Sequence, residues 1–327
     1  MKEPFDLRPL GATGMQVSVV ALGCWPIAGM TSLDVNEADS RATVHAALDA
    51  GVNFFDTAYC YGLDGESERL IGPILQPVRE RVVIATKGGI HWGPDRKQVK
   101  DARPATLRRE CEVSLARLGV DAVDLLYLHA PDPATPIAES AGELKRLLDE
   151  GKTRSVGASN CSLAQLEEFA RECPLAACQP HYNLLQREIE AELLPWCAQR
   201  SVSVMIYWPL LKGLLAGKLP RDFVFKPGDG RAKYPMFQGA EWVRNQDFLD
   251  KLRPIAEREG MTLAELSVNW TLCRSGVTSA LCGAKRPDQI LDTAGAMGRR
   301  LSPAALAAIE TAYQERGPAV SQAAVSS

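Results

Sequence analysis

Eight short apolar runs, each followed by a segment with helical character, constrain the fold of this chain more than any other feature. The runs lie at residues 19–23, 52–55, 81–86, 124–128, 155–158, 176–179, 203–207 and 279–283. Apolar runs without strong alternation are typical of parallel strands that are buried on both faces. Eight of them alternating with helices predict an α/β fold, a closed (β/α)8 TIM barrel rather than an open sheet. No G-x-G-x-x-G follows any run, which argues against a Rossmann domain.

The domain organisation follows from the same pattern. We expect a single barrel domain over residues 1–327, because single α/β barrels reach this length. Weak alternation around two glycines predicts an N-terminal β-hairpin region at 1–18. Residues 315–327 are expected to form a flexible tail.

Three segments interrupt the regular alternation. A helix that begins at Glu66 is expected to end at residue 71, before Gly72 and Pro73. Residues 91–103 are polar and are expected to form a loop. After the seventh run, residues 213–241 are rich in Gly, Pro and Lys and lack periodicity, which predicts a long functional loop at the barrel mouth.

Charge and cysteine usage exclude several classes of partner. A net charge of -3 and a pI near 5.9 give no reason to expect nucleic acid or an anionic membrane as a partner. No segment has the length of a membrane span, and the N-terminus lacks the apolar core of a signal peptide. Nine irregularly spaced cysteines without a C-x-x-C pair predict free thiols and no metal site. We therefore expect a soluble, cytoplasmic protein, and the sequence makes no prediction of its oligomeric state.

Ionisable residues follow three consecutive apolar runs. Asp56 ends the second run and Tyr61 follows it, Lys87 ends the third, and His129 ends the fourth. In a (β/α)8 barrel the C-terminal ends of the strands converge on one mouth. A tyrosine with a pKa of about 10 can donate a proton, and a neighbouring ammonium stabilises the phenolate that remains. With Asp56 holding Lys87 charged and a neutral His129 bonded to a carbonyl oxygen, the set fits reduction of a carbonyl by an external hydride.

The later runs end in groups suited to holding a ligand. Hydrogen-bonding, aromatic and cationic residues stand at these ends: Ser159, Asn160, Gln179, Tyr207, Lys285 and Arg286. Each ionisable residue taken alone has an ordinary structural explanation, such as a turn or a solvated charge. Their joint placement at one mouth favours function. Of the other histidines, we interpret His45 and His181 as structural and leave His91 open.

On these residues the chain resembles the aldo-keto reductases over nearly its whole length. The family's Asp, Tyr, Lys and His tetrad matches Asp56, Tyr61, Lys87 and His129, in the settings D-T-A-Y-C-Y-G, A-T-K-G-G and Y-L-H-A-P-D. The resemblance implies an NADPH-dependent oxidoreductase that reduces aldehydes or ketones to alcohols, with Tyr61 as general acid.

The resemblance also implies a nucleotide site. The implied cofactor-binding residues are Ser159, Asn160, Gln179, Tyr207, Leu210, Gly213, Lys218, Gly283, Lys285, Arg286 and Gln289. The first three would bind the nicotinamide carboxamide, Tyr207 would stack on its ring, and the run from Leu210 to Lys218 would lie near the pyrophosphate. Lys285 and Arg286 would engage a 2′-phosphate, which favours NADP over NAD.

Two departures from the family pattern bear on the ligands. Trp208 follows Tyr207 where many relatives have a small residue, and Asp292 and Thr293 stand where relatives often have Glu and Asn. The substrate is expected to be a small carbonyl compound or sugar. Four aromatic residues are expected to wall its pocket: Trp25, Tyr59, Trp92 and Trp208.

Two other functions are compatible with the same residues. One is an NAD(P)-dependent sugar or alcohol dehydrogenase that runs in the oxidative direction. The other is a nucleotide-sensing regulatory subunit with little turnover. A metal-dependent barrel hydrolase is disfavoured, because the strand ends lack clustered His and Asp ligands.

Overall fold

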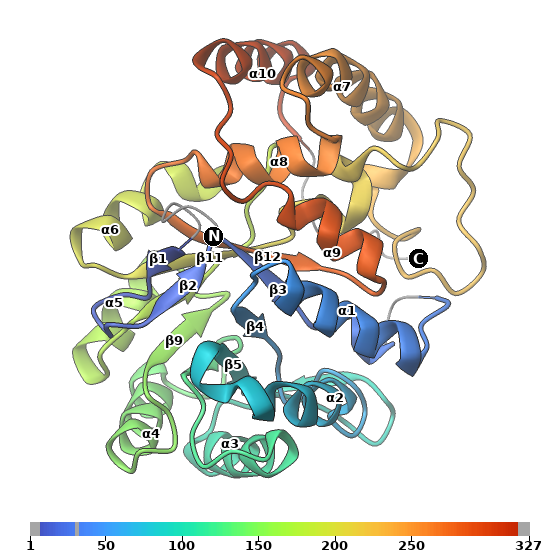
Figure 1. Cartoon of the computed structure of the whole chain (residues 1–327). Helices are drawn as coiled ribbons and strands as arrows, with labels where there is room; N and C mark the ends of the chain where they lie inside the picture. The colour runs from blue at the N-terminus through green and yellow to red at the C-terminus, as the bar shows by residue number, and fades with distance from the viewer. Residues whose placement is uncertain (1–6, 30–32, 320–327) are drawn as a thin grey trace.

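Eight parallel strands close into a barrel (Figure 1). The structure is a computed structural model that describes residues 7–29 and 33–319. The barrel strands are β3 (Val20–Gly23), β4 (Phe54–Asp56), β5 (Val83–Gly88), β8 (Leu125–Leu128), β9 (Val156–Ser159), β10 (Ala177–Gln179), β11 (Ser203–Tyr207) and β12 (Val277–Gly283). They pair in this order, and β12 closes the barrel by pairing with β3. The predicted TIM barrel is confirmed.

Helices surround the barrel on its outside (Figure 1). They are α1 (Glu37–Asp49), α2 (Glu66–Leu75), α3 (Pro104–Leu118), α4 (Ile137–Asp149), α5 (Leu163–Glu172), α6 (Leu193–Gln199), α8 (Leu263–Leu272) and α9 (Pro287–Ala294). Two more, α7 (Gly239–Arg258) and α10 (Pro303–Arg316), pack against each other beyond α8. Among the described residues, no helix is both long and apolar enough to cross a membrane.

The strands have two buried faces, which explains their continuous apolar sequences. Phe54 lies in a small cluster inside the barrel, whereas Phe55 belongs to the larger cluster between the strands and the helices. Both are fully buried. This is the alternation expected of neighbouring residues in one strand.

The predicted N-terminal hairpin is present and plugs the barrel. Strands β1 (Leu7–Pro9) and β2 (Gln16–Ser18) pair antiparallel. Leu10 and Val17 are fully buried and join the cluster inside the barrel. Residues 1–6 of the predicted hairpin region lie outside the described residues.

The helix from Glu66 is longer than the sequence indicated. It continues through Gly72 and Pro73 to Leu75, so the predicted end at residue 71 is wrong. A Cβ added at Gly72 would lie 2.6 Å from the backbone oxygen of Leu118 at the end of α3. The glycine therefore allows two helices to pack closely and does not mark a helix end.

A second hairpin occupies the segment that was predicted to be a loop. Strands β6 (Ile90–Trp92) and β7 (Gln98–Lys100) pair antiparallel immediately after β5. We call β6, β7 and their turn the flap.

The long connection after β11 is present as predicted, and it contains two 3-10 turns, η5 (Leu211–Ala216) and η6 (Pro235–Phe237), before α7.

The boundary predicted for the C-terminal tail is wrong. Glu315 and Arg316 belong to α10, and Arg316 is buried. Its guanidinium donates to Glu241 and, at 2.7 Å, to the side-chain oxygen of Asn245, both in α7. Residues 320–327 of the predicted tail lie outside the described residues.

Candidate active site

Asp56, Lys87 and Tyr61 meet at the C-terminal ends of β4 and β5. The Lys87 Nζ donates to Oδ1 of Asp56 at 2.5 Å, to the backbone oxygen of Thr57 at 2.8 Å and to the hydroxyl of Tyr61 at 3.1 Å. The other carboxylate oxygen of Asp56 accepts from Nε2 of Gln179 at 2.8 Å. Asp56 and Lys87 are buried, so this is an ion pair inside the protein, with its polar atoms hydrogen-bonded.

Burial and charge set the protonation of these groups. Burial lowers the pKa of Lys87, but the charge of Asp56 and the contacts with Asp56 and Tyr61 together outweigh it, and the pKa is raised above its ordinary value. Burial raises the pKa of Tyr61, and the charge of Lys87 acts in the opposite direction. At neutral pH the site therefore holds a charged lysine beside a protonated tyrosine, which is an arrangement suited to proton donation.

His129 also lies close to the tyrosine. The ring centroids of Tyr61 and His129 are 5.9 Å apart. Burial and the positive charge of Lys87 hold the pKa of His129 well below its usual range, so the imidazole is neutral. The structure thus brings all four residues of the predicted tetrad together.

The ends of β9, β10 and β11 form a cluster of amide, hydroxyl and aromatic groups. Asn160 accepts from the hydroxyl of Tyr207 at 2.8 Å and donates to the hydroxyl of Ser159 at 3.1 Å. Ser159 in turn donates to the backbone oxygen of Gln179 at 2.9 Å. Asn160 has a left-handed backbone, with φ of 57°, a conformation that is rare away from glycine and often occurs at functional sites.

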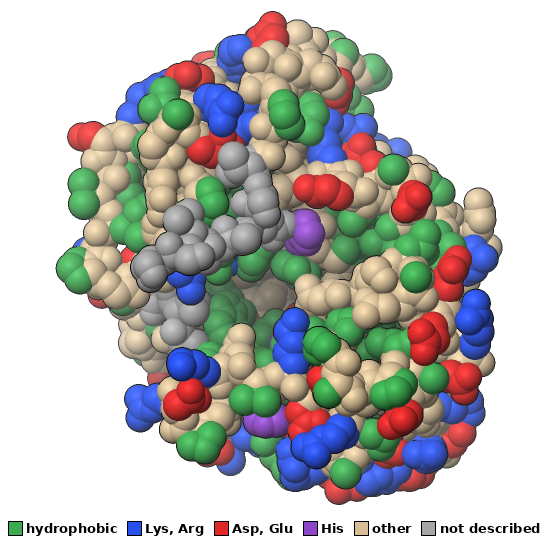
Figure 2. Space-filling model, turned by 180° about the vertical axis from the view of Figure 1, so that it is seen from behind, with side chains coloured by type: hydrophobic (Ala, Val, Ile, Leu, Met, Phe, Trp, Pro, Cys, Tyr) green, Lys and Arg blue, Asp and Glu red, His purple; other side chains and the backbone are tan. Residues whose placement is uncertain are grey.

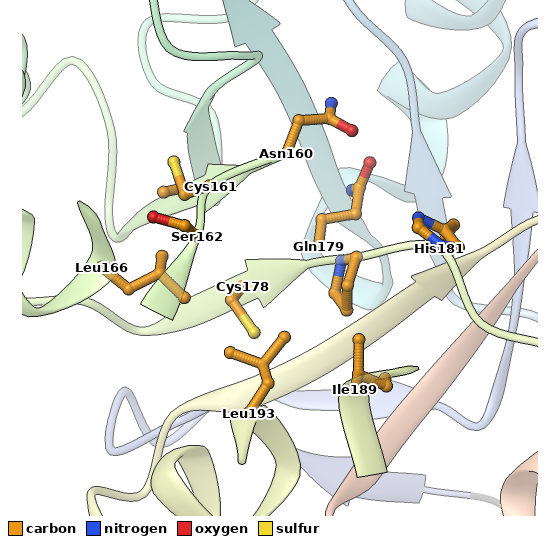
Figure 3. A pocket seen from close by; sticks show the side chains of 11 residues that line it. Asn160, Cys161, Ser162, Leu166, Cys178, Gln179, His181, Ile189 and Leu193 are labelled. Atoms are coloured by element: carbon orange, nitrogen blue, oxygen red, sulfur yellow. The ribbon is translucent and has the colours of Figure 1, made fainter. Parts of the chain in front are cut away.

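Figure 3 shows how these side chains relate to a cavity behind them. The amide groups of Asn160 and Gln179 lie near each other, on the side away from Leu193. The cavity, of about 280 Å³, is lined below them by apolar side chains and thiols, among them Leu166 and Cys178. The amides therefore stand at a boundary between a polar mouth and an apolar layer.

Cationic residues gather where the nucleotide phosphates were expected. Burial, and then the positive charge of Arg286, lower the pKa of Lys285, and Arg231 acts in the same direction. The Lys285 ammonium donates to the backbone oxygen of Leu33. Seen from the side opposite to Figure 1, the surface is hollowed near its centre, with lysine and arginine side chains around the hollow (Figure 2).

The remaining predicted nucleotide residues occupy varied settings. Gly213 adopts φ of 90° within η5, and a Cβ placed there would lie 3.6 Å from Arg231. Lys218 forms an ion pair with Asp292 at 2.7 Å. The side chain of Gln289 accepts from the backbone N–H of Lys285 at 2.9 Å and so shapes the start of α9. Gly283 is exposed and Leu210 is half-buried.

Three of the four predicted wall residues lie beside the tetrad or the Tyr207 ring. Trp25 meets Tyr61 edge to face at 5.0 Å between centroids, and Trp208 meets Tyr207 at 5.1 Å. Trp92, from the flap, packs against the apolar cluster that Tyr61 also borders.

The structure places the fourth wall residue, Tyr59, elsewhere. Its ring lies 4.6 Å from the guanidinium carbon of Arg117 in α3. The backbone oxygen of Tyr59 also accepts from Arg117, at 3.0 Å. The expectation that Tyr59 walls the pocket is corrected accordingly, because its ring packs toward the helical layer.

Two residues at the mouth were missed by sequence reasoning. Cys60 lies 3.6 Å from Nδ1 of His129, measured from its Sγ. The Lys212 ammonium lies 3.5 Å from the ring centroid of Trp208 and 4.3 Å from that of Tyr234. Both residues lie inside motifs described above. A motif is defined only by its fixed positions, so it makes no prediction for the residues that lie between those positions.

Comparison with known proteins agrees with this geometry. A model of the Aldo/keto reductase family matches residues 19–314. The chain is 36% identical over 288 residues to the aldo-keto reductase YhdN of Bacillus subtilis (strain 168), with 87% of this chain and 86% of the relative covered. It is 35% identical over 312 residues to the NADH-specific methylglyoxal reductase of Escherichia coli (strain K12), covering 90% and 94%.

A solved structure leads to the same result. The glycerol dehydrogenase of Gluconobacter oxydans matches with a TM-score of 0.90 and 35% identity, over 99% of this chain and 100% of that one. Sequence and structure therefore agree over almost the whole length, and the chain belongs to the aldo/keto reductase family.

Proposed function

We propose that this protein reduces a small aldehyde or ketone to the alcohol with NADPH, and that Tyr61 donates the proton. The observation that carries the proposal is the buried chain of contacts from Asp56 through the Lys87 ammonium to the Tyr61 hydroxyl. These contacts place the positive charge of Lys87 next to the hydroxyl of Tyr61, the one protonated hydroxyl of the tetrad. Such an arrangement stabilises the negative charge that forms on the tyrosine as its proton leaves.

The residues at the mouth fit a nicotinamide dinucleotide. Ser159, Asn160 and Gln179 converge beside the ring of Tyr207, a donor set that suits a flat ring bearing a carboxamide. When bound, the nicotinamide supplies the hydride. Lys285 and Arg286 would hold the adenosine end, and their adjacent positive charges suit a 2′-phosphate.

The protein's own part in the reaction is to orient the substrate and move one proton. Tyr61 is protonated and can donate to the carbonyl oxygen as negative charge develops there. Lys87 stays charged because Asp56 faces it. The neutral His129 can donate a second hydrogen bond to the same oxygen. The walls of Trp25, Trp92 and Trp208 restrict access of water to the site.

Exchange of one hydroxyl tests the role of Tyr61. Tyr61→Phe is expected to lower kcat by at least roughly 100-fold, the usual effect of a lost general acid, while nucleotide binding is retained. Tyr59→Phe is the matched control. It also removes a tyrosine hydroxyl, two residues before Tyr61 in the sequence, but from a ring that packs against Arg117. Full activity in Tyr61→Phe would contradict the proposal.

The alternative of a regulatory subunit has a separate test on wild type. Tight nucleotide binding without turnover across a broad carbonyl panel would favour that alternative.

The nucleotide preference has its own test. Wild type and the Lys285→Ala, Arg286→Ala double variant are titrated with NADPH and NADH, with tryptophan fluorescence as the readout. We expect wild type to bind NADPH more tightly and the double variant to lose that preference while its NADH affinity changes little. Because one relative is an NADH-specific methylglyoxal reductase, equal or tighter NADH binding by wild type would assign NADH instead.

The similarity to a glycerol dehydrogenase favours one second candidate, oxidation of a small alcohol or sugar. The same contacts would serve in reverse, starting from the Tyr61 phenolate beside the Lys87 ammonium, which would accept the alcohol proton. Initial rates in both directions, at one pH and with both nucleotides, separate the two. Faster turnover of alcohols than of the matching carbonyl compounds would support the oxidative direction.

A further inference from the structure

The two ring nitrogens of His129 differ in their surroundings. The His129 backbone is held at both ends, since its N–H donates to Gly88 at 2.8 Å and its carbonyl accepts from Asn160 at 2.9 Å. Its imidazole is neutral, so the proton sits on either Nδ1 or Nε2. Only the nitrogen that carries the proton can donate to a ligand oxygen.

Cys60 is the residue that faces Nδ1. Its Sγ lies 3.6 Å from that nitrogen, and within the described parts of the chain the ring has no other hydrogen-bond partner. Cys60 is 1% exposed. Its own carbonyl accepts from Nε1 of Trp92 at 2.9 Å, so the flap holds residue 60 in place.

The chemistry of the two partners decides which one donates. Burial raises the pKa of the Cys60 thiol to about 12, so the sulfur carries its hydrogen at neutral pH. The S–H group is a weak donor and sulfur a weak acceptor, but an imidazole nitrogen without a proton is a good acceptor. The favoured hydrogen bond therefore runs from S–H to Nδ1. A thiolate paired with an imidazolium, as in a cysteine nucleophile, does not fit these protonation states.

We propose that Cys60 is a positioning residue, which donates its thiol hydrogen to Nδ1 of His129 and thereby keeps the ring proton on Nε2. The opposite tautomer would turn a lone pair toward a ligand oxygen beside Tyr61 and repel it. The identity of that oxygen, a substrate carbonyl, rests on the proposed function. The tautomer itself does not, because it is a property of the protein without ligand.

Nuclear magnetic resonance of the nucleotide-free protein tests the tautomer directly. Long-range 1H–15N correlation on histidine-labelled protein distinguishes a protonated ring nitrogen from an unprotonated one. The chain has only four histidines, and His129→Asn identifies the signal. Cys60→Val removes the donor at similar volume, and Cys60→Ser keeps one. Cys111→Val is the control for loss of a buried thiol, because Cys111 is buried like Cys60 but lies in the helix α3.

The expected result is a proton on Nε2 in wild type, Cys60→Ser and Cys111→Val, and a mixture of tautomers in Cys60→Val. A proton on Nδ1 in wild type overturns the proposal without any variant. An unchanged His129 signal in Cys60→Val also overturns it, and Cys60→Ala replaces that variant if it fails to fold.

Kinetics give a second readout. We expect Cys60→Val to lower kcat by roughly 3- to 10-fold, the range that one lost hydrogen bond allows, with little change in nucleotide KM and with recovery in Cys60→Ser. An equal loss of kcat in Cys60→Val and Cys60→Ser would contradict the positioning role of Cys60. If no carbonyl compound is reduced by any form, the proposed function fails while the tautomer result stands.

Discussion

Lys87 contacts as many acceptors as it has hydrogens to donate. Its ammonium has three N–H groups, and Asp56, the backbone oxygen of Thr57 and the Tyr61 hydroxyl accept them. Lys87 is 1% exposed, so no hydrogen of this ammonium is left for a ligand. Its influence on a substrate must pass through Tyr61, as a charge that favours the phenolate.

Lys212, a second enclosed lysine at the mouth, has very different neighbours. Its ammonium faces the rings of Trp208 and Tyr234. Burial, and then the charge of Lys233, lower its pKa to about 7. Because Lys212 lies in the run proposed to meet the pyrophosphate, bound nucleotide would supply an anion and raise this pKa.

The resulting prediction concerns pH. A pKa that rises on binding means that the complex takes up a proton, so nucleotide affinity is expected to fall as pH increases above about 7. Titration calorimetry in two buffers of different ionisation enthalpy measures the proton uptake. Lys212→Met, which keeps the apolar stem, should abolish the uptake and weaken binding. Lys233→Met removes a charge that lowers the pKa of Lys212, so it should reduce the uptake without abolishing it. A wild type without uptake at pH 7.5 would contradict the prediction.

Elements differ in how far the sequence predicts them. The barrel strands were predictable because burial on both faces leaves continuous apolar runs. The flap was not, because β7 is exposed throughout and short polar strands have no distinctive pattern. Asp56, Lys87 and His129 were predicted from strand ends, and Tyr61 from the loop that follows Asp56. The direction of the Tyr59 ring and the contact of Cys60 with His129 depend on the backbone path of that loop, which a periodic sequence pattern does not predict.

The N-terminal hairpin is expected to stabilise the barrel through a few inward side chains. Leu10 is fully buried inside the barrel, whereas Leu7 of the same hairpin is 45% exposed. Leu10→Ala should lower the free energy of unfolding by roughly 2–5 kcal/mol, and Leu7→Ala by less than about 0.5 kcal/mol. Urea denaturation measures both. Equal losses would show that the plug contributes nothing specific.

The flap is tied to α3 by a buried carboxylate. Glu110 accepts from the backbone N–H of Gly89 at 2.7 Å and contacts Nδ1 of His91 at 2.9 Å. Burial raises the pKa of Glu110 to about 7, above its value of about 4.3 in an unfolded chain. The folded state therefore binds more protons than the unfolded state between these two values, and its stability falls as pH rises through that window.

Glu110→Gln tests this link between pH and stability. The amide keeps an oxygen for Gly89 but does not titrate, so the variant should gain stability relative to wild type by roughly 1 kcal/mol per pH unit between pH 5 and 7. Urea denaturation at several pH values gives the difference. A difference independent of pH would mean that Glu110 is ionised throughout this range.

At the scale of the whole molecule, the pair α7 and α10 extends the barrel on one side. Arg316, near the end of α10, reaches Glu241 and Asn245 near the start of α7. A buried arginine could not be foreseen in a segment that was interpreted as a frayed tail, because its partners lie about 70 residues away in sequence.

Two truncations test the corrected boundary. A chain that ends at residue 314 loses the hydrogen bonds of Arg316 to α7, while Glu241 keeps its ion pair with Arg244, so the truncation is expected to cost roughly 1–3 kcal/mol. A chain that ends at residue 319 keeps the contact and should melt like the full-length protein. The comparison uses the Tm of each form. Equal Tm values for both truncated chains would restore the boundary at residue 315.

Closure of the barrel by β3 and β12 also has a consequence for synthesis. Leu22 pairs with Cys282, and Gly23 with Gly283. On the ribosome, β3 emerges long before its partner is translated, so one edge of the growing sheet stays unpaired until nearly the whole chain has been made. Exposed apolar strand edges favour association between chains. The nascent protein should therefore depend on chaperones, or on slow translation late in the message, more than a fold whose neighbours in space are neighbours in sequence.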